Sequence, residues 1–365
     1  GYRTWRGTTY NAYLIISDKK VLVDTVKEPF FDEMMGRMRG LLDPSELDYI
    51  IINHAEKDHS GSLPKVKEVA RRAQVVVSPR FGREHLLRVF GDDFGAASYE
   101  KLDVGKELVF VPTPMLHWPE SMVTYIPQNK LLLPNDAFGQ HLASSGRFDD
   151  EVDEDVLISE AKKYYANILM PFGDLILGAL DKLSSLDIKI IAPSHGVIWK
   201  NPEKILGLYR RWGKGETVPK AIIVYDSMWG GTEKMAKAIL EGILEEGVCV
   251  KLFSLSSTHM SDIVADILEA KAVITGSPTL NNGLFPSVGS FLTYLMGLKP
   301  KNKIGFAFGT YGWGGGAIGL IEEGMRKMGF NMLDSFGVKF SPDKDELERL
   351  KERGREIGRR IRVNG

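Results

Sequence analysis

The second half of the chain alternates between apolar and amphipathic segments with a regularity that few folds accommodate. It opens with four consecutive apolar residues at 221–224, which is typical of a strand buried on both faces of a sheet. The predicted strands are Lys220–Tyr225, Cys249–Ser254, Ala272–Ser277, Lys303–Gly309 and Met332–Lys339, and the predicted helices are Thr232–Glu246, Ser261–Ala270, Ser287–Met296, Ala317–Met328 and Lys344–Arg362. Five strand–helix units in a row predict a doubly wound parallel sheet.

The first half mixes strands and helices less regularly. We predict strands at Tyr10–Ile16, Lys20–Asp24, Tyr49–Asn53, Gln74–Ser78, Glu107–Pro112, Ser121–Ile126, Lys130–Pro134 and Ile188–Ala192, and helices at Phe30–Gly40, Leu63–Arg72, Arg83–Phe90 and Asp155–Ile168. The strands Ser121–Ile126 and Lys130–Pro134 are separated by a turn and predict an antiparallel hairpin. The mixture indicates sheets covered on the outside by helices.

A short polar segment, 213–219, ends in proline and separates the two patterns. We therefore expect two domains, residues 1–215 and 219–365, as a chain of 365 residues favours.

The formal net charge is -1, which gives no indication of a nucleic-acid partner. No apolar stretch reaches the ~20 residues that span a bilayer, and no secretory signal opens the chain. Because the chain begins with Gly1, we expect a preceding segment to be missing from this numbering.

The single cysteine, Cys249, allows no internal disulfide and no cysteine-rich metal module. We therefore expect a cytoplasmic protein whose metal ligands, if any, are histidines and carboxylates. Such residues gather where predicted strands end: His54, Glu56, Asp58, His59, His117, Asp136 and His195. Four imidazoles and three carboxylates are enough for two metal ions, and this share of carboxylates favours iron or manganese over zinc.

The remaining histidines have simpler interpretations. His141 follows Asp136 closely and is assigned to a loop, with a place near the metals as the alternative. His85 lies in a predicted helix beside Glu84 and is assigned to a solvated face. His259 directly precedes a predicted helix and is assigned a capping or surface role.

The order of these ligands resembles that of the metallo-β-lactamase fold, in which His-x-His-x-Asp-His is followed by a histidine, a bridging aspartate and a last histidine. The chain departs from it at Glu56, where the hydrolases carry a second histidine. This version resembles the flavodiiron proteins, as do the segments 7–14, 116–122 and 164–168. The resemblance implies an αββα domain in which one iron is bound by His54, Glu56 and His117, the other by Asp58, His59 and His195, and Asp136 bridges them.

The C-terminal half carries three polar or glycine-rich loops at the ends of its first, third and fourth predicted strands. The first loop joins a strand to a helix N-terminus and contains no lysine, which favours a monophosphate over a nucleoside triphosphate. This half resembles flavodoxin. The resemblance places the phosphate of FMN on Ser227, Met228, Trp229, Gly230, Gly231 and Thr232, and the flavin ring between Ser277, Pro278, Thr279, Asn281, Asn282, Gly283 and Thr310, Tyr311, Gly312, Trp313, Gly314. An empty flavodoxin-like scaffold is the alternative.

Fusion of these two halves predicts an enzyme whose FMN supplies electrons to a di-iron centre. The flavodiiron resemblance implies reduction of dioxygen to water, of nitric oxide to nitrous oxide, or of both. It also implies an external electron donor, rubredoxin or reduced coenzyme F420, and a head-to-tail homodimer or a dimer of such dimers. Two alternatives remain: a zinc hydrolase of the lactamase or glyoxalase type with a regulatory flavodoxin domain, and an electron-transfer protein whose metal site is lost.

Overall fold

The computed structural model describes residues 2–363, which form two compact units. The N-terminal unit comprises residues 4–164 and 174–210, and the C-terminal unit comprises residues 2–3, 165–173 and 211–363. None of the helices between residues 2 and 363 combines the length and apolar character that crossing a bilayer requires.

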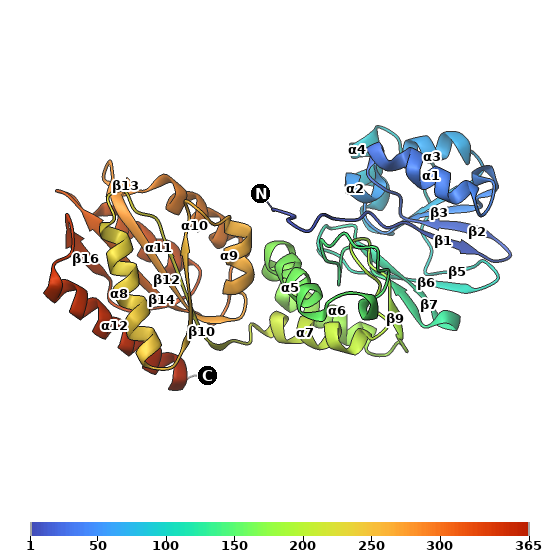
Figure 1. Ribbon diagram of the computed structural model, residues 1–365. Helices are drawn as coiled ribbons and strands as arrows, with labels where there is room; N and C mark the ends of the chain where they lie inside the picture. Colours follow the sequence, from blue (N-terminus) through green and yellow to red (C-terminus); the bar gives the residue numbers. More distant parts are fainter. Residues whose placement is uncertain (1, 364–365) are drawn as a thin grey trace. The chain divides into compact units, whose positions relative to one another are not determined.

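The N-terminal unit contains two sheets (Figure 1). The first sheet is built, in spatial order, from β1 (Tyr13–Ile16), β2 (Lys20–Val23), β3 (Tyr49–Ile52) and β4 (Gln74–Val77). The second is built from β5 (Lys101–Asp103), β6 (Glu107–Pro112), β7 (Met122–Ile126), β8 (Leu131–Leu133) and β9 (Ile190–Ile191). The predicted hairpin is confirmed, because β7 and β8 pair antiparallel.

The first sheet is buried on both faces, as β3 illustrates. Ile51 packs with Leu108 and Phe110 of the second sheet in one apolar cluster. Its neighbours Ile50 and Ile52 point to the opposite face, as alternation along a strand requires, and pack against helices. The helices of this unit are α1 (Phe31–Arg39), α2 (Lys57–Ser60), α3 (Leu63–Val69), α4 (Gly82–Phe90), α5 (Glu154–Tyr164), α6 (Gly173–Leu183) and most of α7 (Pro202–Lys214), whose residues from Arg211 onwards belong to the C-terminal unit.

The C-terminal unit is a parallel sheet in the order β11-β10-β12-β14, with β15 and β16 both paired to β14 (Figure 1). Its strands are β10 (Val218–Tyr225), β11 (Cys249–Ser254), β12 (Ala270–Leu280), β13 (Gly283–Leu284), β14 (Ile304–Tyr311), β15 (Asn331–Met332) and β16 (Phe336–Lys339). Its helices are α8 (Gly231–Glu245), α9 (Met260–Ile267), α10 (Pro286–Leu298), α11 (Gly316–Lys327) and α12 (Lys344–Val363). This is the predicted doubly wound sheet.

One segment of the C-terminal unit, residues 165–173, comes from near the end of the first half of the chain. Directly after α5, residues Tyr165–Leu169 form a π-helical turn. Within this unit the Asn167 side-chain amide donates to the Ser261 carbonyl over 3.0 Å, and the Tyr294 hydroxyl donates to Asn167 Oδ1 over 2.7 Å. The predicted helix over Asp155–Ile168 is helical throughout, but its hydrogen bonding changes from the α to the π pattern at Tyr165.

Candidate metal centre and flavin loops

The ligand candidates of the N-terminal unit lie in loops that follow strands. His54 comes two residues after β3, Asp136 three residues after β8, and His195 four residues after β9. Strands β8 and β9 run parallel, so Asp136 and His195 emerge at the same edge of their sheet. His117 lies in the loop between β6 and β7. The sequence therefore brings four separate segments together at one place.

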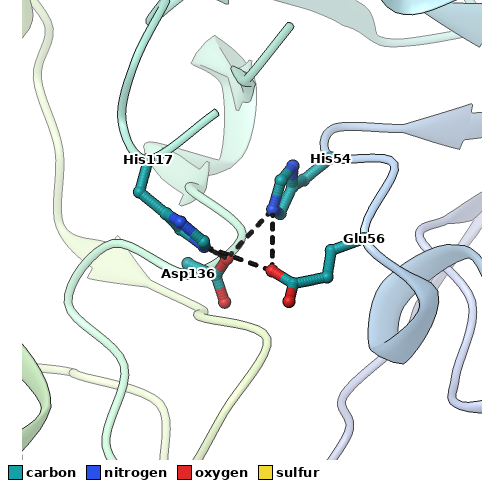
Figure 2. A group of neighbouring side chains, drawn as sticks. All are labelled: His54, Glu56, His117 and Asp136. Carbon is teal, nitrogen blue, oxygen red and sulfur yellow. Dashed lines mark hydrogen bonds and ion pairs between the residues drawn. The ribbon is translucent and has the colours of Figure 1, made fainter. Parts of the chain in front are cut away.

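One ligand cluster consists of His54, Glu56, His117 and Asp136, whose ligand atoms lie within 4.8 Å of one another (Figure 2). Glu56 Oε2 lies 3.3 Å from His54 Nε2 and 3.4 Å from His117 Nε2. Asp136 Oδ2 lies 3.6 Å and 3.1 Å from the same two nitrogens. Two imidazole nitrogens and two carboxylate oxygens thus face a common point, as the ligands of one metal ion do.

The second cluster consists of Asp58, His59 and His195. His59 Nε2 lies 3.4 Å from Asp58 Oδ1, and His195 Nε2 lies 3.4 Å from Asp58 Oδ2. Asp136 Oδ1 lies 3.0 Å from His59 Nε2 and 3.3 Å from His195 Nε2. Asp136 therefore directs one oxygen to each cluster, which is the arrangement of a carboxylate shared by two metal ions.

The chemistry of these atoms fits bound cations. Asp58 Oδ1 and His59 Nε2 are buried and, although they lie close to each other and His59 Nε2 also lies close to Asp136, form no hydrogen bond of regular geometry in the described structure, a costly state that a metal ion would relieve. Burial lowers the pKa of His54, but its hydrogen bonds to Glu120 and Glu56 outweigh burial and leave its pKa at about 10. Burial also lowers the pKa of His117, but its hydrogen bonds to Asp136 and Glu56 outweigh burial and raise the pKa to about 9. The surrounding carboxylates thus favour positive charge at this place.

Backbone and side-chain partners set the orientation of the histidine rings. His54 Nδ1 lies 2.8 Å from Glu120 Oε1, and His195 Nδ1 donates to the Thr9 carbonyl over 2.7 Å. A proton held on Nδ1 leaves Nε2 free to bind a metal. Beneath the loop after β3, Asp24 Oδ1 accepts from the Asn53 backbone over 2.8 Å, and Asp24 Oδ2 accepts from the Asn135 side chain over 3.0 Å. This buried network fixes the residues that precede His54 and Asp136.

The three predicted flavin loops lie at one edge of the C-terminal sheet. Strands β10, β12 and β14 are parallel neighbours, so the loops that follow them emerge together. The loop residues at the predicted positions are Ser227, Met228, Trp229, Gly230, Gly231 and Thr232 after β10, Ser277, Pro278, Thr279, Asn281, Asn282 and Gly283 at the end of β12 and the turn into β13, and Thr310, Tyr311, Gly312, Trp313 and Gly314 at the end of β14 and beyond.

The first of these loops has the features of a phosphate site. It runs into helix α8, whose first backbone N–H groups have no partner within the helix. Gly230 adopts a φ of 81°, which glycine tolerates, and its N–H donates to Ser227 Oγ over 3.0 Å. Thr232 is buried, and its hydroxyl lies 3.1 Å from that of Thr310. Trp229 and Trp313 are 91% and 97% exposed, so neither is an anchor for packing within this unit.

Comparison with known proteins identifies the family. Residues 8–196 match the family described as "ODP family beta lactamase", and residues 223–354 match the flavodoxin family. The chain is 47% identical to the nitric oxide reductase of Moorella thermoacetica over 369 residues, which cover 99% of this chain and 92% of that protein. The crystal structure of the flavodiiron protein from Giardia intestinalis superimposes with a TM-score of 0.95 at 34% identity, covering 100% of this chain and 91% of that one. The chain is a flavodiiron protein.

Other members of the family agree with this assignment. The chain is 38% identical to the anaerobic nitric oxide reductase flavorubredoxin of Escherichia coli O1:K1, covering 98% of this chain and 77% of that protein. The structure of rubredoxin oxygen:oxidoreductase from Desulfovibrio gigas superimposes with a TM-score of 0.96 at 37% identity, covering 100% of this chain and 93% of that one. The predicted fold class, a lactamase-like αββα domain followed by a flavodoxin-like domain, is confirmed.

For the other three histidines of this flavodiiron protein, the surroundings in the structure can be compared with those expected from the sequence. His259 caps helix α9, because its side chain accepts from the Ser261 N–H, as predicted. His141 lies in a loop, but its ring is 4.8 Å from that of His195, and its Nδ1 lies 2.7 Å from Thr8 Oγ1. The assignment of His85 to a solvated face is wrong: its Nδ1 lies 2.7 Å from the buried Glu120 Oε2.

Sequence reasoning missed the groups that surround the ligands. Glu120 and Tyr164 both contact ligand side chains, at His54 and Asp136. Both lie in segments that carry the family resemblance, but nothing in their spacing distinguishes them from ordinary core residues. The Thr9 carbonyl could not be found at all, because a backbone acceptor has no side-chain signature.

Proposed function

We propose that this flavodiiron protein reduces dioxygen to water, nitric oxide to nitrous oxide, or both, at a di-iron centre that receives its electrons through FMN. The observation that carries the proposal is that the two carboxylate oxygens of Asp136 face different clusters. Oδ2 faces His54 and His117, and Oδ1 faces His59 and His195. One ion would be bound by His54, Glu56 and His117, the other by Asp58, His59 and His195, and Asp136 would bridge them.

Iron suits this ligand set better than zinc. Each cluster contains carboxylate oxygens beside imidazole nitrogens, a mixture that favours redox-active iron over a zinc site rich in histidine. When bound, two iron ions supply two one-electron couples and open positions for a diatomic ligand. The protein's part is to hold the ions side by side on Asp136 and to keep their histidines in one tautomer through Glu120 and Thr9.

The C-terminal unit supports FMN as the electron carrier. The turn from β10 into α8 offers backbone N–H groups and hydroxyls to a monophosphate, and the loop at the end of β14 offers Tyr311 and the exposed Trp313 to a flavin ring. FMN accepts two electrons together and releases them one at a time, which matches one-electron acceptors at the metal site. The relatives named as nitric oxide reductase and as rubredoxin oxygen:oxidoreductase support the two substrates.

We propose that the electrons reach FMN from a separate donor protein or reduced cofactor, as the similarity to rubredoxin oxygen:oxidoreductase suggests. Rubredoxin or reduced coenzyme F420 is the donor we propose, and the functional domains are residues 1–215 and 219–365. The working assembly is a head-to-tail homodimer, or a dimer of such dimers, in which the flavin of one copy serves the metal centre of the other. Sedimentation of the FMN-loaded protein tests this assembly, and a monomer with full activity would contradict it.

The decisive experiment measures metal, flavin and reactivity on one purified sample. About two irons and one FMN per chain are expected, and the reduced protein should be reoxidised in stopped-flow mixing with dioxygen or nitric oxide. The faster of the two reactions identifies the substrate. Zinc in place of iron, with flavin reoxidation unchanged when the metal is removed, would replace this proposal with a hydrolase.

A further inference from the structure

A buried carboxylate connects one metal ligand to a histidine of helix α4. Glu120 is 2% exposed, and its Oε1 accepts from the Ala55 N–H over 3.0 Å and lies 2.8 Å from His54 Nδ1. Its other oxygen, Oε2, lies 2.7 Å from His85 Nδ1, an ion-pair distance at which neither atom forms a hydrogen bond of regular geometry in the described structure. His54 and His85 therefore hold opposite oxygens of the same carboxylate.

The ring of Trp118 contacts both histidines. Its ring meets that of His54 edge-on at a centroid distance of 5.0 Å, and that of His85 edge-on at 5.9 Å. His85 also lines a cavity of about 430 Å³ together with Arg80, Phe81, Glu84, Met115 and two prolines. Residue 85 therefore borders this cavity and is not one of the seven candidate ligands, so it can be substituted without removing a ligand.

The histidines of the other cluster have different partners. His195 Nδ1 donates to a neutral backbone carbonyl, that of Thr9. His59 Nδ1 is buried and has no hydrogen-bond partner in the described structure. The two halves of the candidate centre are therefore unequal: His54 is held by an anionic carboxylate, and neither His59 nor His195 has such a partner on Nδ1.

A carboxylate on the outer nitrogen of a metal-bound imidazole draws the N–H proton towards itself and makes the inner nitrogen a stronger donor. A stronger donor stabilises ferric more than ferrous iron. We propose that Glu120, held in place by His85, gives the iron bound by His54 a lower reduction potential than the iron bound by His59 and His195. Each iron gains or loses one electron and no bond changes, so Glu120 and His85 are positioning residues. This inference rests on the proposed di-iron function.

The test is a reductive titration of the iron-loaded protein, in which electron paramagnetic resonance follows the two successive one-electron steps. The lower of the two potentials belongs to the iron bound by His54. Glu120→Gln keeps an acceptor but removes the charge, and it should raise the lower potential and narrow the gap between the steps. Loss of such a partner changes metal affinity by about 10- to 100-fold, and each tenfold change in the preference for ferric iron is about 59 mV in a one-electron couple.

Two substitutions at residue 85 separate this role from general packing. His85→Leu removes the polar contact of Glu120 Oε2 and should raise the lower potential, by less than Glu120→Gln does. His85→Gln offers a side-chain N–H to that oxygen and should return the lower potential to its wild-type value. Glu84→Gln changes a neighbouring residue of the same helix and cavity wall and should shift neither potential. Metal analysis and thermal unfolding establish that each variant is folded and loaded with iron.

The possible outcomes distinguish a failure of the Glu120 and His85 role from a failure of the proposed di-iron function. Equal shifts of both potentials, or no shift in His85→Leu with two irons bound, would overturn the role of Glu120 and His85. If Glu120→Gln loses iron, the residue 85 series alone decides. A wild-type protein without two redox-active irons would instead overturn the proposed function.

Discussion

The hydroxyl of Tyr164 donates a hydrogen bond to Asp136 Oδ1 over 2.9 Å, in a fully buried setting. That oxygen is the one directed at His59 and His195. Tyr164 therefore orients the carboxylate on which the two clusters meet, although it offers no ligand itself.

Replacing Tyr164 with phenylalanine should weaken metal binding at this centre. The change removes one hydrogen bond to a buried charged group, which is worth about 1.5–3 kcal/mol, so iron affinity should fall by about 10- to 100-fold. Competition with a chelator of known iron affinity measures the loss. Tyr125→Phe is the matched control, because its hydroxyl donates to the Asp187 carbonyl, away from the clusters. Equal iron affinity in Tyr164→Phe and wild type would refute the role of the hydroxyl.

Replacing Glu56 with histidine should shift the metal preference towards zinc. The change restores the histidine of the lactamase pattern and removes the carboxylate that faces His54 and His117. The ratio of iron to zinc after exposure to both metals should fall on the order of tenfold. Elemental analysis measures it. Glu68→His adds the same imidazole on an exposed surface and should leave the ratio unchanged. An unaltered ratio in Glu56→His would mean that Glu56 does not set the preference.

Replacing Thr232 with valine should release FMN while leaving the metal in place. Valine keeps the shape of the buried side chain but removes the hydroxyl beside Thr310, at the N-terminus of α8. Loss of one charge-assisted hydrogen bond to phosphate should weaken FMN binding by about 10- to 100-fold. Fluorescence titration with FMN measures this. Thr293→Val, whose hydroxyl only bonds within α10, is the control. Unchanged FMN affinity would place the phosphate elsewhere.

Replacing Asp266 with asparagine should destabilise the C-terminal unit in a pH-dependent way. Burial raises the pKa of Asp266, but hydrogen bonds from Lys220 and Lys251 outweigh burial and leave the pKa lowered. A lowered folded-state pKa gives stability that is complete above the unfolded-state pKa of about 4 and is lost as pH falls through the folded-state value. The variant should therefore lose about 1–3 kcal/mol at pH 7, and the difference from wild type should shrink below about pH 4.

Urea unfolding at several pH values measures that difference. Asp334→Asn provides the comparison, because Asp334 is an exposed acid of the same unit. A difference between Asp266→Asn and wild type that persists undiminished into acid would contradict the assignment of stability to the ionised carboxylate.

The flavodoxin half could be predicted well because both faces of its sheet are covered, so apolar runs and helical periodicity alternate along the chain. The exception is Met332–Lys339, which was predicted as one strand. It forms β15 and β16, which pair with separate parts of β14, at Ile304 and Gly305 and then from Phe308 onwards. The break at 333–335 depends on this pairing and has no local signature.

The elements of the first half are less predictable from the sequence, because they depend on tertiary contacts. Helix α7 runs through Gly213 to Lys214, although Gly213 was assigned to the polar segment between the two domains. Tyr209 and Trp212 of this helix are buried, and their packing outweighs the weak helix propensity of glycine. The short strand β5 has exposed ends and no apolar run, so only its pairing with β6 identifies it.

The clustering of the candidate ligands could be predicted because they follow strand ends, where side chains from distant segments converge. Their partners could not. His85 looked solvated beside Glu84, because sequence shows the helix but not the carboxylate that reaches it from the loop before β7. The sequence therefore predicts the candidate ligands at this site, whereas the groups that orient them can be identified only in the folded structure.

The π-helical turn has a consequence for how such a chain can be recombined. Tyr164 belongs to the N-terminal unit, and the next residues, through Asn167, are bonded within the C-terminal unit to Ser261 and Tyr294. The two units are thus interleaved along the chain rather than joined only at one linker. A gene split at residue 216 would separate Asn167 from both partners, and a chimera would need to exchange this turn together with the flavodoxin domain. Asn167 thus belongs to the C-terminal unit although it lies about fifty positions before residue 216.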